Sequence, residues 1–137
     1  MTKFPAMLRA MAFVPWLGAM MYGSHTPTPP GSEELARFAN WRPDLWVHFG
    51  EYLVLGLLLS AALSLFFRGR WWPVVVGLCA ALAAVDEWTQ ALVPNRVPDA
   101  QDGLADLAGA VVAVLIYLWL NRLIKRRRAS APMPGTP

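Results

Sequence analysis

The sequence predicts an all-α membrane protein, with four transmembrane helices in a small bundle and both termini in the cytoplasm. First, hydrophobic residues make up 56% of the 137-residue chain, which is too apolar for an ordinary soluble domain of this size. Second, four segments reach or nearly reach the roughly 18–20 apolar residues that cross a bilayer. Third, acidic and basic residues occupy separate parts of the chain, as loops on opposite sides of a membrane do.

The expected helices cover residues 6–22, 45–67, 71–93 and 104–124. They form one domain, residues 1–124, and residues 125–137 follow as a basic, proline-rich cytoplasmic tail.

The first helix has the weakest signal, because it contains Arg9 and Pro15. A signal peptide is the alternative, since basic residues precede an apolar stretch here. We favour an uncleaved helix, because the residues around Gly23 and Ser24 show no A-x-A cleavage pattern.

The ends of the other helices carry recognisable signals. Pro43 starts the second helix, and Asp44 is expected as its N-cap. Pro94 ends the third helix. Asp102 is expected to cap the fourth helix, in which Gly109 allows close helix contact.

The charge pattern predicts the orientation. One basic set lies at the two ends of the chain and in the turn between the second and third helices: Lys3, Arg9, Arg68, Arg70, Arg122, Lys125, Arg126, Arg127 and Arg128. The acidic residues lie in or beside the other two loops: Glu33, Glu34, Asp44, Glu51, Asp86, Glu87, Asp99, Asp102 and Asp106. The positive-inside rule therefore places both termini in the cytoplasm and the acidic face outside. The basic tail is expected to contact anionic lipid rather than nucleic acid.

The only cysteine, Cys79, lies in the middle of the third helix. It excludes an intramolecular disulfide and is expected to be a small buried hydrophobic residue.

Ionisable residues interrupt the apolar sequence most densely in residues 85–109. Asp86 and Gln90 are four residues apart, so they form a polar stripe at the outer end of the third helix, with Glu87 beside it. On the second helix, His48, Glu51 and Tyr52 share one face, so His48 and Glu51 are expected to point the same way, within about one turn of the outer surface. Ionisable groups at membrane depth are costly unless they are paired or hydrated, which makes this level the candidate site.

The candidate polar cluster comes from three helices and one turn and comprises His48, Glu51, Tyr52, Asp86, Glu87, Gln90, Arg96, Asp102 and Asp106. A structural interpretation is open for each member: Arg96 pairs with aspartates, His48 bonds to Glu51 or a backbone carbonyl, and Asp99 is simply solvated. Adjacent Asp86 and Glu87 weaken that interpretation, because both need partners, and His48 and Arg96 are the expected ones.

Four motifs resemble those of the VanZ-like family of small bacterial integral membrane proteins. They are DLWVHFGEYLVLG with Asp44, His48, Tyr52 and Gly56, DEWTQ at residues 86–90, PNR at 94–96 and DGLADLAGA at 102–110. The combination covers most of the chain and is specific. The sequence departs from the family pattern at Leu45, where lysine is common, at Asn95, where glycine is usual, and at Asp106, often an asparagine.

The resemblance implies a multi-pass protein of the bacterial cytoplasmic (inner) membrane. The family takes its name from a protein associated with reduced sensitivity to the glycopeptide teicoplanin, but the underlying biochemical activity is not established. Without the lysine at Leu45, Arg96 is left to balance the carboxylates.

Three functions remain open. The first is binding of an anionic envelope component or headgroup by Arg96 and His48, since arginine suits phosphate. The second is an accessory subunit that contacts partner membrane-protein subunits. The third is a metal-dependent membrane enzyme, with His48, Glu51, Asp86 and Glu87 as candidate ligands of a hard divalent cation. No serine or cysteine nucleophile accompanies His48, so we lean against an enzyme and predict no cofactor.

Overall fold

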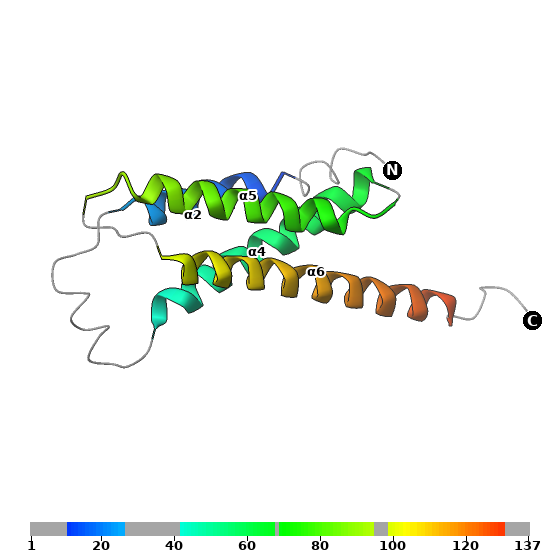
Figure 1. Cartoon of the computed structure of the whole chain (residues 1–137). Coiled ribbons are helices and arrows are strands. Elements are labelled where there is room, and N and C mark those ends of the chain that lie inside the picture. Colours follow the sequence, from blue (N-terminus) through cyan, green and yellow to red (C-terminus); the bar gives the residue numbers. More distant parts are fainter. Residues whose placement is uncertain (1–10, 27–41, 68, 95–98, 131–137) are drawn as a thin grey trace, which may run out of the picture.

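The computed structural model describes residues 11–26, 42–67, 69–94 and 99–130, and these residues form four helices without strands (Figure 1). The helices are α2 (Phe13–Ser24), α4 (Pro43–Phe66), α5 (Trp72–Gln90) and α6 (Ala100–Ala129). The expected all-helical fold is confirmed. Three helices are long and apolar enough to cross a membrane: Pro43–Phe66, Trp72–Gln90 and Ala100–Arg127. Residues 6–10 of the expected first helix lie outside the described residues.

Two expected N-caps are wrong. Helix α4 begins two residues earlier than expected: Arg42 is the N-cap residue and Pro43 the first helical residue, which places Asp44 inside the first turn. Helix α6 is capped by Asp99, whose carboxylate accepts a hydrogen bond from the Gln101 amide at 2.9 Å. Asp99 is therefore a cap and not simply solvated, while Asp102 lies one turn further in.

The other ends of α5 and α6 also differ from expectation. Helix α5 ends at Gln90, because a tight turn follows in which the Leu92 and Val93 amides donate to the Thr89 and Gln90 carbonyls. Helix α6 continues to Ala129, so the first basic residues of the expected tail belong to the helix.

The closest helix packing joins α4 and α6. A Cβ atom on Gly109 would overlap the α4 backbone at Phe49, and one on Gly56 would lie 2.7 Å from the Ala113 Cβ. The absence of side chains at these two glycines lets the helix backbones approach, as small residues do in membrane bundles. The role expected for Gly109 is confirmed.

The core lies where α4, α5 and α6 meet, and its buried apolar members include Leu55, Val75, Cys79, Ala110 and Val114. Cys79 is free and buried, as expected. Helices α4 and α6 begin at one end of the bundle, and helices α2 and α5 end there (Figure 1). The polar residues of the candidate site gather there.

Candidate functional site

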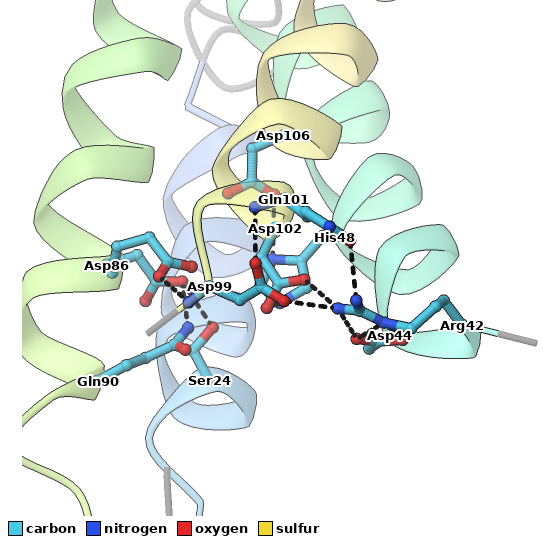
Figure 2. A network of polar contacts seen from close by, with 11 residues as sticks. Ser24, Arg42, Asp44, His48, Asp86, Gln90, Asp99, Gln101, Asp102 and Asp106 are labelled. Carbon is cyan, nitrogen blue, oxygen red and sulfur yellow. Dashed lines mark hydrogen bonds and ion pairs between the residues drawn. The ribbon is translucent and has the colours of Figure 1, made fainter. Parts of the chain in front are cut away.

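The exposed rim of the site is organised around Arg42, the residue before α4 (Figure 2). Its guanidinium donates to both oxygens of Asp44 at 2.6–3.1 Å, and to Asp99 Oδ2 at 2.9 Å. A further bond to the Gln101 amide oxygen measures 2.8 Å. Arg42 thus ties the start of α4 to the start of α6. These bonds raise the pKa of Arg42 above its ordinary value. The Gln101 amide and Arg42 lower the pKa of Asp99.

His48 lies below the rim, between two aspartates of α6. Its Nδ1 is 3.1 Å from Asp106 Oδ1, and its Nε2 is 3.6 Å from Asp102 Oδ2. Carboxylate oxygens only accept hydrogen bonds, so both ring nitrogens face acceptors. His48 therefore joins α4 to α6, and a doubly protonated ring would be a cation between the two carboxylates.

Asp86 lies on α5 at the same end of the bundle and is 2% exposed (Figure 2). One of its oxygens, Oδ2, accepts hydrogen bonds from Ser24 Oγ at 3.0 Å and from Gln90 Nε2 at 2.9 Å. The other, Oδ1, is 4.0 Å from His25 Nδ1. The end of α2 is therefore held against the end of α5 by a buried carboxylate.

His25, just after α2, also contacts α5. Its Nδ1 donates to the Met21 carbonyl at 2.7 Å, and its Nε2 lies 2.9 Å from Thr89 Oγ1. Thr89 Oγ1 also lies within hydrogen-bond distance of the Val85 and Asp86 carbonyls, at 2.8 and 3.0 Å.

Glu87 connects α5 to the cap of α6. Its Oε2 accepts a hydrogen bond from the Asp99 backbone amide at 2.9 Å. Glu87 therefore stabilises the residue that caps α6, rather than pairing with His48 as expected.

Several buried oxygens at this end of the bundle have no hydrogen-bond partner. Within the described part of the chain they are the Tyr52 hydroxyl, Asp86 Oδ1, Glu87 Oε1, Asp102 Oδ1 and Asp106 Oδ2. Buried oxygens without partners are rare in proteins and costly, which makes them a candidate binding site.

The structure gathers most of the expected cluster at one level: His48, Tyr52, Asp86, Glu87, Gln90, Asp102 and Asp106. Glu51 is half-buried on α4, and its backbone carbonyl accepts from Trp16 Nε1 at 3.0 Å. His48 bonds to Asp106 rather than to Glu51 or a backbone carbonyl. Arg96 lies outside the described residues, so its pairing stays a prediction.

Sequence reasoning missed Ser24, His25 and Arg42. Two signals could have found them. The Ser-His pair lies at the end of an apolar helix that must end at the level of Asp86, and Arg42 directly precedes the proline that starts the next helix.

The candidate metal ligands fall into separate groups, because His48 faces α6 while Asp86 faces α2. No group of three or more His, Cys, Asp or Glu side chains that could hold a metal ion occurs among the described residues.

A comparison with protein-family models matches residues 13–121 to the VanZ/LLP1 family. No curated protein and no solved structure matches the chain. The match covers all four described helices except the end of α6, and it includes the whole polar level described above. The motifs of the second, third and fourth expected helices therefore carry a true family relationship, and the chain belongs to the VanZ/LLP1 family.

Proposed function

We propose that this VanZ-like membrane protein crosses the bacterial cytoplasmic membrane four times, with both termini in the cytoplasm. The helix directions support this arrangement, because α2 and α5 end, and α4 and α6 begin, at the polar end of the bundle (Figure 1). The described basic residues at the opposite end are Arg70, Arg122, Lys125, Arg126 and Arg127. Acidic residues dominate the polar end, which is the pattern of an extracytoplasmic face.

The basic end of α6 would contact anionic lipid of the inner leaflet. The 30 residues of α6 span about 45 Å at 1.5 Å per residue, which exceeds the roughly 30 Å hydrocarbon core. The last turns, with exposed Lys125 and Arg126, therefore extend into the headgroup region.

Single cysteines test the topology. Leu92 is exposed in the turn after α5, and Ser130 is exposed after α6. In intact cells, a membrane-impermeant thiol reagent should label Leu92→Cys, and it should label Ser130→Cys only after permeabilisation. Wild-type protein is the control, since Cys79 is buried and should stay unlabelled. The reverse pattern would overturn the orientation.

We further propose that the polar level binds the headgroup of an envelope component. The observation that supports it best is the state of Asp86 and Asp106, which are 2% and 0% exposed and each keep one oxygen without a hydrogen-bond partner. A carboxylate oxygen left unsatisfied at such depth destabilises the protein, so its retention favours a ligand that supplies donors.

The anionic part of such a component needs a cation that is not already engaged. His48 faces two carboxylates, and Arg42 is bonded to Asp44 and Asp99. Arg96, the cation that the sequence predicts for the phosphate, lies outside the described residues, so this contact stays a prediction. The accessory-subunit and metal-enzyme alternatives have no comparable supporting observation in the described ranges.

Thermal unfolding tests the binding function. A fluorogenic thiol dye reports unfolding through Cys79, which becomes reactive only when the core opens. Bacterial polar lipids added to detergent-solubilised protein should raise the unfolding midpoint, because a ligand that binds only the folded state stabilises it. The shift should be much smaller in Asp106→Asn and should persist in Asp44→Asn, a matched change on the exposed rim. Equal shifts in all three proteins would contradict the proposal.

A further inference from the structure

The site has too few cations for its carboxylates. Among the described residues, Arg42, His25 and His48 are its cations, even when both histidines are fully protonated. They face a larger set of acidic side chains: Asp44, Asp86, Glu87, Asp99, Asp102 and Asp106. Arg37 and Arg96, which lie outside the described residues, carry one charge each and could offset only part of the difference. A positively charged ligand would therefore be favoured over an anion at the buried level of the site, which is that of Asp86 and Asp106.

Tyr52 supplies an observation that is independent of the acidic residues. The side chain is 0% exposed, and its hydroxyl has no hydrogen-bond partner. Asp106 and Asp86 both lie close enough to act electrostatically on this hydroxyl. Tyr52 lies one turn below His48 on α4, and Asp106 lies about one turn below Asp102 on α6. An unpartnered hydroxyl thus lies at the same depth as the unpartnered oxygens of the two aspartates.

We infer that a primary ammonium group, that of an aminophospholipid headgroup, binds between Asp86, Asp106 and Tyr52. This rests on the proposed headgroup-binding function and names the chemistry of the headgroup. A primary ammonium group has three N–H donors, as in lysine. The three unpartnered acceptors are Asp86 Oδ1, Asp106 Oδ2 and the Tyr52 hydroxyl. A cation between the two carboxylates would also offset the mutual repulsion of Asp86 and Asp106.

Other cations fit this level less well. A divalent metal ion such as Ca²⁺ takes six to eight oxygen ligands, and the described helices gather no group of three ligating side chains. A quaternary ammonium group has the charge but no N–H, so it would leave the three acceptors without hydrogen bonds.

The acidic face of α6 offers a route from the surface to this level. Side-chain exposure falls from 37% at Asp99 to 11% at Asp102 and 0% at Asp106, and these residues lie on one helix face (Figure 2). An ethanolamine-type headgroup can place its amine inward along this face while its phosphate stays near the rim. In the proposed topology, the rim lies near the headgroups of the outer leaflet.

An N-methylation series tests the inference. Wild-type protein in detergent is titrated with dioleoyl phosphatidylethanolamine, its N-methyl and N,N-dimethyl derivatives and phosphatidylcholine, and the Cys79 dye gives the unfolding midpoint. The charge is constant along the series while N–H donors are lost one by one. Apparent affinity should fall stepwise, by about tenfold or more in total, as expected for hydrogen bonds to charged groups. Free ethanolamine, tested separately, shows whether the amine alone or the whole lipid is needed.

Two variants locate the effect. Asp106→Asn should abolish the dependence on N-methylation. Tyr52→Phe should weaken it, and this variant should fold at least as well as wild type, because the lost hydroxyl makes no hydrogen bond. Asp44→Asn, on the exposed rim, should keep the wild-type dependence.

The outcomes separate the two proposals. Equal stabilisation by phosphatidylethanolamine, phosphatidylcholine and phosphatidylglycerol would overturn the ammonium inference and leave headgroup binding in place. Stabilisation by none of these lipids or by bacterial polar lipids would overturn headgroup binding as well. An unchanged dependence on N-methylation in both Asp106→Asn and Tyr52→Phe would show that the amine binds elsewhere and would overturn the proposed site.

Discussion

The rim and the buried level of the polar end are both rich in carboxylates, but the hydrogen bonding of the carboxylate oxygens differs between them. At the rim, both oxygens of Asp44 and both of Asp99 accept hydrogen bonds. At the buried level, Asp86 and Asp106 each have one oxygen with a partner and one without. Water can donate hydrogen bonds to the exposed oxygens, whereas the buried oxygens need donors within the protein or a ligand. Satisfaction at the rim therefore indicates a structural role, and the deficit below it indicates a place for a ligand.

The largest effect should come from His48→Ala. The substitution leaves the buried Asp106 without its ion-pair partner, whereas Asp102 keeps Arg42 at 3.6 Å. Removing one partner of a buried ion pair costs about 3–5 kcal/mol. The unfolding midpoint measured with the Cys79 dye should fall sharply.

His25→Ala is the matched control, because His25 also faces an aspartate but its side chain is 34% exposed. Its effect should be distinctly smaller, since water can replace the lost contact. Equal losses in the two variants would mean that burial does not distinguish the two levels.

A smaller effect is expected from Ser24→Ala. Ser24 Oγ donates to Asp86 Oδ2 within the bundle, and a hydrogen bond to a charged group contributes about 1.5–3 kcal/mol. The same unfolding assay should show a moderate loss of stability. Ser130→Ala removes an exposed bond to the Arg126 carbonyl and should change little. A loss of stability in Ser24→Ala no larger than in this control would mean that the bond from α2 to Asp86 does not stabilise the protein.

Hydrophobic length and charge pattern were enough to predict the long helices. Helices α4, α5 and α6 begin and end within about five residues of the expected bounds. The larger errors have local causes. The start of α6 is set by Asp99 because its carboxylate reaches the Gln101 amide, and from sequence alone Asp99 and Asp102 are equivalent cap candidates.

The membership of the polar level was predictable, but its pairing was not. Helical spacing places His48 and Tyr52 on one face, and Asp86 with Gln90 on another. Which faces meet depends on the rotation of each helix, and that rotation follows from the close approach at Gly56 and Gly109. This packing puts His48 against Asp106 instead of Glu51, and it brings the end of α2 to Asp86.

The smallest effect concerns acid pH at the rim. The pKa of Asp99 is lowered by the Gln101 amide and Arg42, so Asp99 stabilises the fold at a pH above its ordinary pKa of about 3.9. This contribution is lost as the pH falls through the lowered, folded-state pKa. Asp99→Asn keeps a good helix cap but has no charge to lose.

Circular dichroism at 222 nm should therefore show wild type slightly more stable than Asp99→Asn at pH 6, with the gap closing toward pH 3. The gap should be small because the Asp99 side chain is 37% exposed. A gap that widened with falling pH would mean that Asp99 is stabilised in its protonated form. The rim would then have an unsatisfied carboxylate like those of the buried level, and the contrast that assigns the ligand to Asp86 and Asp106 would be lost.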